Sequence, residues 1–381
     1  MKAIINAKII NSGKIINGYN LLFSKRIIAL TQQLPIWAEV IDAKGAYLSA
    51  GFIDIHIHGS AGADVMDANE DALNRISKSI LQTGTTAYLA TTMTMSSSSI
   101  IEALKSIKNY RSSVGAKLLG VHLEGPFINP SKHGAQNPSH IQLPNLKPIQ
   151  PYMDIIKMIT LAPEIENAQA FIAHLKTNYP NILLSIGHSN ATFEETQQSI
   201  DWGISHATHL FNAMNPLHHR KPGVVGAILA NDKVSCDLIA DMIHVHPAFF
   251  NLIYKLKRDQ LILITDAMRA GCLACGEYDI GGQKAIVKNG EARLLDGTLA
   301  GSVLRINDAL KNFYQHTDIT LPELISMVTS TPAKKLGLKM GEIKEDYPAD
   351  LVLFDQSFNI LKTFVDGKIS YTNQFFDTHK E

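Results

Sequence analysis

Two histidines lie two residues apart in the apolar run 51-GFIDIHIHGS-60, which is rich in β-branched residues. Side chains alternate between the two faces of a strand, so His56 and His58 point to one side and Ile55 and Ile57 to the other. Two aligned imidazoles at the end of a strand can hold one metal ion. The alternative is a structural pair on a polar strand face, and the rest of the chain has to decide between the two.

Further polar side chains close other apolar runs of the chain. Glu124 ends KLLGVHLEG, His188 ends NILLSIGHS, His209 ends SHATHLF and Asp266 ends LILITDA. Taken singly, Glu124 could be a solvated strand-end residue, His188 a group at a helix N-terminus and Asp266 a cap or a catalytic base. Together with the histidine pair they give four imidazoles and two carboxylates, a composition suited to Zn, Fe or Mn.

The segments that carry these residues follow a repeated pattern of predicted strands and helices. Eight β-branched, apolar runs alternate with amphipathic stretches, and this alternation predicts an α/β fold, a (β/α)₈ TIM-like barrel. An open doubly wound sheet is the alternative, but no GxGxxG follows the first strand. In a barrel, catalytic groups lie at the C-terminal ends of the strands, where the six polar residues fall. The expected strands are 52–58, 86–93, 117–125, 158–164, 181–189, 205–211, 234–241 and 261–267.

The two ends of the chain have a different character from its middle. Residues 1–50 and 339–381 contain short alternating runs broken by Gly and Asn, and VDGK reads as a hairpin turn. We expect these ends to pair into one small β-sandwich domain beside a hydrolase barrel domain at 51–338. The β-like segment that follows the eighth strand is expected to form a hairpin insertion over the barrel mouth.

The bulk composition excludes several classes of protein. Among 381 residues, 35 basic and 35 acidic side chains balance, so neither nucleic acid nor an anionic membrane is an expected partner. No apolar run approaches the roughly 20 residues that span a bilayer, and the start lacks the order of a signal peptide. Three cysteines suit a reducing cytoplasm, and we interpret Cys272 and Cys275 as ordinary loop thiols.

The strand-end pattern is similar to that of the amidohydrolase superfamily, whose members carry HxH on strand one, histidines on strands five and six, and an aspartate on strand eight. PADLVLFD with VDGK resembles their C-terminal segment. Many members place a modified lysine on strand four, where this sequence has TLAPE and no lysine. GVHLEGPFINPSKHGAQNP supplies Glu124 instead, which resembles the N-acetylglucosamine-6-phosphate deacetylase family. The match continues through IGHSNAT, ATHLFNAM, RKPGVVGAIL, IADMIHV, TDAM and LAGSVL.

This resemblance implies metal-dependent hydrolysis of the acetamide of N-acetyl-D-glucosamine 6-phosphate, in amino-sugar catabolism and cell-wall sugar recycling. It implies Glu124, His188 and His209 as ligands of one divalent metal, with zinc expected and iron or manganese as alternatives. His56 and His58 could hold a second metal bridged by Glu124. The metal would polarise the acetyl carbonyl and acidify a water. Asp266 would accept the proton of that water and pass it to the departing amine.

The resemblance also implies which residues bind the substrate. Arg220 and His244 are expected to bind the phosphate, for which a guanidinium is well shaped, although each could be an ordinary loop residue. The resemblance suggests a homodimer, with the phosphate site completed across the interface. Rival hypotheses are a dihydroorotase-like cyclic amidase, an adenine deaminase, or a metal-free barrel that serves in assembly. The expected substrate-binding residues are Ala135, Gln136, Asn212, Ala213, Arg220, His244, Leu299, Ala300 and Gly301.

Overall fold

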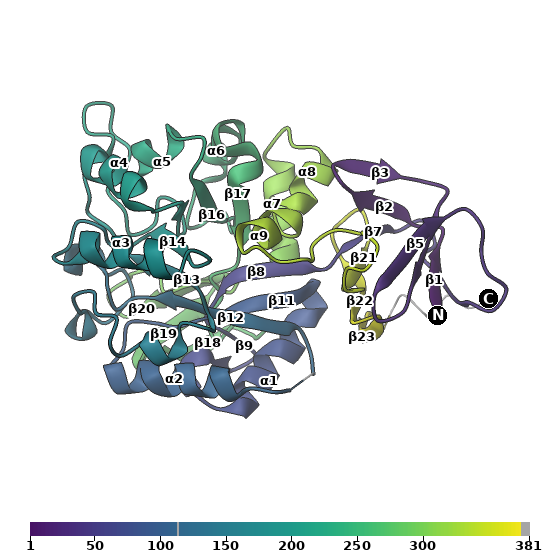
Figure 1. Ribbon diagram of the computed structural model, residues 1–381, viewed down its shortest axis with the longest axis horizontal. Helices are drawn as coiled ribbons and strands as arrows, with labels where there is room; N and C mark the ends of the chain where they lie inside the picture. The colour runs from purple at the N-terminus through teal and green to yellow at the C-terminus, as the bar shows by residue number, and fades with distance from the viewer. Residues whose placement is uncertain (113, 375–381) are drawn as a thin grey trace.

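Eight parallel strands form a closed barrel in the computed structural model, which describes residues 1–112 and 114–374 (Figure 1). Every run predicted as a barrel strand overlaps an observed one, so the predicted fold class is confirmed. The sheet closes just beyond the ends of its last and first strands, where His58 N donates to Ala267 O at 2.9 Å. In sheet order the strands are β8 (Phe52–Ile57), β11 (Thr85–Thr91), β12 (Lys117–Glu124), β13 (Ile156–Leu161), β14 (Leu183–Ile186), β15 (His206–Ala207), β16 (Ser235–Ile239) and β17 (Leu261–Ile264).

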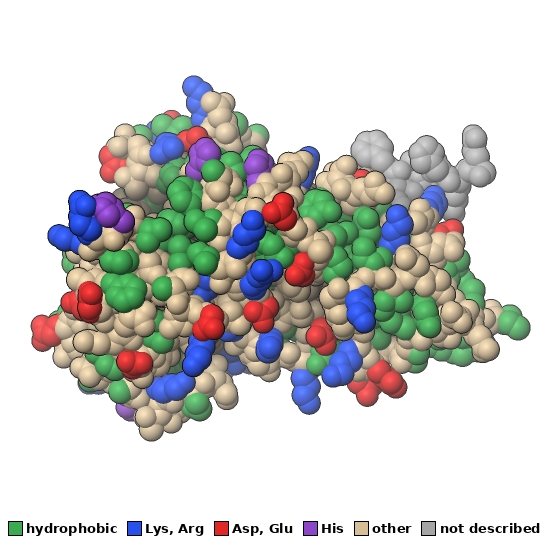
Figure 2. Space-filling model, turned by 90° about the horizontal axis from the view of Figure 1, so that it is seen from above, with side chains coloured by type: hydrophobic (Ala, Val, Ile, Leu, Met, Phe, Trp, Pro, Cys, Tyr) green, Lys and Arg blue, Asp and Glu red, His purple; other side chains and the backbone are tan. Residues whose placement is uncertain are grey.

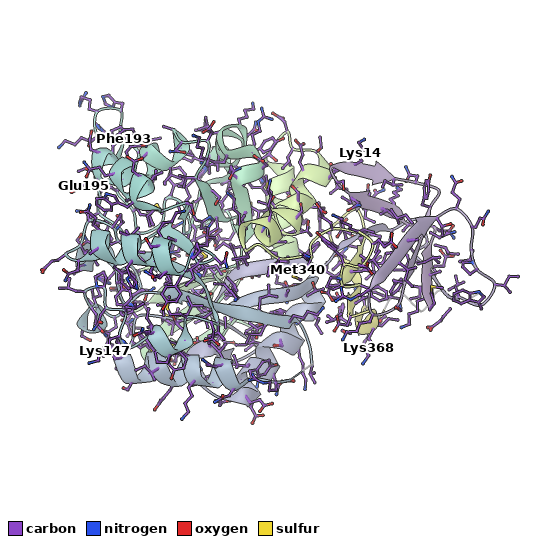
Figure 3. The ribbon with its side chains drawn as sticks, viewed as in Figure 1. Lys14, Lys147, Phe193, Glu195, Met340 and Lys368 are labelled. Carbon is purple, nitrogen blue, oxygen red and sulfur yellow. The ribbon has the colours of Figure 1, made fainter. Side chains whose placement is uncertain are left out.

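Helices follow most barrel strands, where the amphipathic stretches predicted them. The start of α4 shows why such boundaries can be predicted, because Thr192 and Glu195 form a reciprocal capping box there. Glu195 and the first residue of the helix, Phe193, are labelled in Figure 3. The α-helices are α1 (Glu70–Ser79), α2 (Ser97–Asn109), α3 (Ala168–Asn178), α4 (Phe193–Trp202), α5 (Gly223–Leu229), α6 (Phe250–Lys257), α7 (Ile306–Gln315), α8 (Leu321–Ser326) and α9 (Ser330–Lys335). The 3₁₀ turns are η1 (Val65–Asp67), η2 (Ile80–Thr83), η3 (Pro130–Lys132), η4 (Pro138–His140), η5 (Gln150–Tyr152), η6 (Pro247–Phe249) and η7 (Arg258–Gln260).

The two chain ends pair in a small unit beside the barrel, as predicted (Figure 1). Residue Leu351 of the C-terminal segment pairs with Ala50 of the N-terminal one. The sheets run in the orders β5-β4-β1-β6 and β23-β22-β21-β7-β2-β3. Their strands are β1 (Lys2–Ile5), β2 (Lys8–Asn11), β3 (Lys14–Ile16), β4 (Asn20–Phe23), β5 (Ile27–Thr31), β6 (Glu39–Asp42), β7 (Tyr47–Ala50), β21 (Leu351–Phe354), β22 (Ile360–Val365) and β23 (Lys368–Thr372).

The small unit has its own apolar core and is tied to the barrel by charge. Buried side chains from both chain ends, such as Ile4 and Leu351, make up that core. Lys117, at the start of β12, donates to Asp350 at 2.8 Å and to Asp366 at 2.7 Å. Met340, labelled in Figure 3, packs in a third cluster together with barrel-strand residues. The predicted domain boundaries stay a prediction, and residues 375–381 of the C-terminal part lie outside the described residues.

The segment after β17 forms the predicted insertion as a three-stranded antiparallel sheet of β18 (Gly276–Ile280), β19 (Gln283–Lys288) and β20 (Glu291–Leu294). Gln283 of β19 donates to the carbonyl of Ala135, which holds the insertion to the loop after β12. A two-stranded hairpin, β9 (Gly59–Ser60) and β10 (Ala63–Asp64), follows β8.

The charge distribution on the surface and the lengths of the helices agree with what the composition predicts. Figure 2 shows cationic and anionic side chains intermixed over one face, as expected for a chain of zero net charge. Among the described residues, no helix is long and apolar enough to cross a membrane.

Candidate metal centre and substrate pocket

Three of the predicted site residues sit in unusual backbone conformations at the ends of barrel strands. His188, His209 and Asp266 have φ angles of 48°, 35° and 49°, in the left-handed region that non-glycine residues seldom adopt. They lie just beyond β14, β15 and β17, where the chain turns out of the barrel. Such strain persists only when the surrounding structure imposes it, and it is concentrated at functional sites. The turns therefore aim these side chains at one point.

Glu124, His188 and His209 form the first group of converging ligand atoms. His209 Nε2 lies 3.0 Å from Glu124 Oε1 and 3.1 Å from His188 Nε2, and His188 Nε2 lies 3.4 Å from the same oxygen. All three side chains are buried. Two imidazoles and a carboxylate at this spacing are a donor set that zinc and related metals prefer.

His56, His58 and Asp266 form a second group directly beside the first. The two imidazole Nε2 atoms are 3.3 Å apart, so the pair does point to one side as its spacing predicts. Asp266 Oδ1 lies 3.2 Å from His58 Nε2 and 3.4 Å from His56 Nε2. Glu124 stands between the groups, with Oε1 3.5 Å from His56 and Oε2 3.4 Å from His58. One carboxylate thus faces both sets of histidines.

The remaining ring nitrogens support a metal-binding tautomer. His188 Nδ1 lies 2.9 Å from the carbonyl oxygen of Lys132, and His58 Nδ1 lies 3.2 Å from that of Thr91. A carbonyl only accepts, so each Nδ1 carries the proton and each Nε2 presents a lone pair to the centre. The residues present therefore fit a divalent metal ion.

Burial and opposite charges act against each other on the pKa values of this cluster. Burial alone would raise the pKa of Glu124, but the surrounding histidines hold that pKa well below its usual range. Burial alone would lower the pKa of His209, yet the hydrogen bond to Glu124 and its charge raise that pKa to about 9. A metal ion has to displace the proton on His209, so its affinity should increase with pH.

Buried polar groups behind the ligands hold the strand ends in place. Asp237, fully buried in β16, accepts a hydrogen bond from the main-chain N–H of His209 and lies 3.2 Å from His206 Nε2. His206 also lies 2.7 Å from Ser235 Oγ through Nδ1. His206 is thus the packed and hydrogen-bonded member of the HxxH pair, while His209 points to the metal group.

The metal groups lie at the floor of a pocket of about 360 Å³, within the size range of small-molecule sites. His56 and Ala300 are fully buried and do not line it, and Arg220 is exposed in the loop before α5. The predicted residues that line the pocket are His58, Glu124, Ala135, Gln136, His188, His209, Asn212, Ala213, His244, Asp266, Leu299 and Gly301.

The two residues expected to bind phosphate differ in their position relative to the pocket. His244 lines the pocket, and Asp241 Oδ2 lies 2.6 Å from its Nδ1, which leaves Nε2 as the other polar atom of the ring. Arg220 instead contacts its neighbour His219, with 2.6 Å between Nη1 and Nε2. Within one chain, Arg220 does not belong to the pocket.

The sequence did not single out five of the lining residues. Ile280 and Arg293 come from the insertion, and only its predicted position over the mouth hinted at them. Thr298 directly precedes the predicted substrate-binding residues 299–301. Met93 and Gly134 carry no chemical signature that sequence reasoning could have used.

Comparison with known proteins places this geometry among enzymes. The model of the Amidohydrolase family matches residues 47–370. The chain is 42% identical to N-acetylglucosamine-6-phosphate deacetylase of Lysinibacillus sphaericus, over 87% of each chain. It is 33% identical to N-acetylgalactosamine-6-phosphate deacetylase of Escherichia coli O157:H7, over 93% of this chain and 95% of that one. The crystal structure of the N-acetylglucosamine-6-phosphate deacetylase of Pasteurella multocida matches 98% of this chain and 100% of its own, with a TM-score of 0.93 and 32% identity.

Proposed function

Because this chain belongs to the amidohydrolase family, we propose that it hydrolyses the acetamide of N-acetyl-D-glucosamine 6-phosphate to D-glucosamine 6-phosphate and acetate. The observation that carries this proposal is the pair of buried ligand groups at the floor of a pocket at the C-terminal ends of the barrel strands. The reaction belongs to amino-sugar catabolism. Cyclic amidases and adenine deaminases are set aside, because the relatives of this chain are sugar-phosphate deacetylases.

Glu124, His188 and His209 would hold the principal divalent ion, and His56 and His58, with Asp266 beside them, a second. Zinc is our first choice, because the set of imidazoles and carboxylates suits it, and iron or manganese would also fit. A bound ion supplies a Lewis acid that polarises the acyl carbonyl and increases the acidity of water.

Asp266 is the proposed proton carrier. Its carboxylate faces the pocket, and although burial alone would raise its pKa, the neighbouring His56 and His58 lower that pKa below the usual value. Asp266 is therefore ionised and ready to accept a proton from water near neutral pH. The same carboxyl then donates that proton to the amine that leaves, so that the group ends the cycle as it began.

The phosphate is proposed to lie between His244 of one chain and Arg220 of a second copy. Arg220 is exposed and outside the pocket of its own chain, so a second subunit is the proposed source of this contact. Large apolar side chains are exposed in the loops after β15 and β16, in η6 and on α6, and a homodimer would cover them. They are Leu217, Met242, Phe249 and Leu252.

The test compares three sugars and two variants. A hydrogen bond to a charged group contributes about 1.5–3 kcal/mol. Loss of two such contacts, as with unphosphorylated N-acetylglucosamine, should therefore lower kcat/KM by roughly 10²–10⁴. Arg220→Ala should lower kcat/KM for the phosphorylated sugar and leave the poor rate on the neutral sugar nearly unchanged, while the matched control Lys221→Ala should change neither.

Each contrary outcome points to a different error. Equal losses on both sugars would mean that Arg220 supports the fold or the dimer. Equal efficiency of the unaltered enzyme on both sugars would remove the sugar-phosphate assignment. A higher kcat/KM for N-acetylgalactosamine 6-phosphate, the substrate named for one relative, would reassign the sugar and keep the reaction.

A further inference from the structure

Gln136 makes two hydrogen bonds that fix the direction of its amide. Its Oε1 accepts from the main-chain N–H of Thr94 at 2.6 Å, and its Nε2 donates to Glu124 Oε2 at 2.8 Å. A main-chain N–H can only donate, so the amide oxygen must face Thr94 and the NH₂ must face Glu124. The side chain is 3% exposed, which leaves it little freedom to turn away.

Close backbone packing holds this arrangement together. Gly125, next to Glu124, has φ +70°, and a Cβ added there would lie 2.0 Å from Thr94 Oγ1 and 3.4 Å from Gln136 Oε1. The absence of a side chain at residue 125 therefore lets the three partners approach. His133 Nδ1 also lies 3.0 Å from the carbonyl oxygen of Gln136 and braces the loop that carries it.

The two oxygens of Glu124 have different surroundings. Oε1 faces the Nε2 atoms of His209, His188 and His56, at 3.0, 3.4 and 3.5 Å. Oε2 faces His58 and receives the hydrogen bond from Gln136. The final torsion of a glutamate is broad and set only weakly by its rotamer. An external hydrogen bond is therefore what can decide which oxygen meets which group of histidines.

We propose that Gln136 is a positioning residue for the metal ligand Glu124, holding its carboxylate so that Oε1 faces His188 and His209 while Oε2 faces His58. This inference rests on the proposed function only in taking Glu124 as a metal ligand. It gives Gln136 a task that the family resemblance does not, since the resemblance implied a contact with substrate. Outer partners of metal ligands typically contribute 10–100-fold in metal affinity.

The test measures zinc affinity without any substrate. Gln136→Met keeps the length of the side chain and removes both hydrogen bonds. Chelator competition with purified protein should show zinc binding weakened about 10–100-fold. When the variant is then saturated with zinc, KM for the sugar phosphate should stay within about twofold of the unaltered value. Unchanged zinc affinity with a clearly raised KM would overturn the proposal and make Gln136 a substrate contact.

Two further variants serve as a control for the pocket and as a check against poor folding. Thr298→Val alters another polar residue that lines the same pocket, so its zinc affinity should equal that of the unaltered protein. Gln136→Asn keeps an amide that is too short to reach both partners, and it should lose zinc affinity as Gln136→Met does even if the latter folds poorly. Since zinc is measured alone, a wrong sugar assignment would not affect this result, and a failure here would leave the deacetylase proposal standing.

Discussion

Replacing Asp266 by asparagine separates proton transfer from metal binding. The carboxylate faces the pocket, and its Oδ1 lies 3.2 Å from His58 Nε2 in the second ligand group. Residue 266 has φ 49°, a conformation that asparagine adopts as readily as aspartate. Asp266→Asn therefore keeps the shape and backbone of the site and removes only the charge and the basic oxygen.

The expected loss follows from the role of the carboxylate. Positioned acid–base catalysis contributes roughly 10²–10⁴ in rate, which corresponds to about 3–5 kcal/mol in the activation free energy. The principal ligand group does not include Asp266, so one metal per chain should remain bound. The second metal should bind more weakly, because one member of its group has lost its charge.

Two measurements on the same preparation decide the matter. Steady-state deacetylation gives kcat, and elemental analysis gives the metal content of protein purified without chelator. Asp201→Asn, an exposed aspartate on α4, serves as the control and should match the unaltered enzyme in both. Near-normal turnover of Asp266→Asn would refute its role as proton carrier. Complete loss of metal would show that Asp266 belongs to the principal site.

Three further outcomes are expected. His188→Ala should lose nearly all bound metal and activity, whereas His56→Ala should remove at most the second metal; full metal content in His188→Ala, by elemental analysis, would disprove the ligand assignment. Lys117→Met should lower the free energy of unfolding, measured in urea, by about 3 kcal/mol. This value is at the low end of the losses found when a buried ion pair is broken, because the lysine is partly exposed. Lys105→Met, at an exposed lysine, is the control and should change the free energy of unfolding little. Asp237→Ala should weaken metal binding by roughly 10–100-fold in chelator competition, since it removes the oxygen that accepts the main-chain N–H of His209; unchanged affinity would argue against that role.

Local pattern was sufficient for the architecture. Alternation of β-branched runs and amphipathic stretches placed all eight barrel strands, because burial on both faces and helical periodicity are properties of a few consecutive residues. The HxH spacing predicted that His56 and His58 point to one side, which their 3.3 Å separation bears out. The three-residue spacing of His206 and His209 likewise indicated that one would be packed, since an odd spacing on a strand reverses the side chain.

Tertiary structure decided which hydrogen-bond partners a side chain has and whether it enters the pocket. The sequence grouped Gln136 with the substrate contacts, yet its amide is turned toward Glu124 by the main chain of Thr94, a residue 42 positions away. Arg220 resembled a phosphate ligand, but its loop leaves it outside the pocket of its own chain. Arg293 enters the pocket only because the insertion folds over the mouth.

The sequence by itself thus determined the barrel, the strand ends and the chemical types gathered there, because each depends on short-range periodicity and on the order of residues along the chain. Only the tertiary structure decided which Glu124 oxygen faces which histidines and which carbonyl groups set the tautomers of His58 and His188. These details depend on side-chain torsions and on contacts between loops far apart in the chain, where differences of an ångström determine whether a hydrogen bond exists.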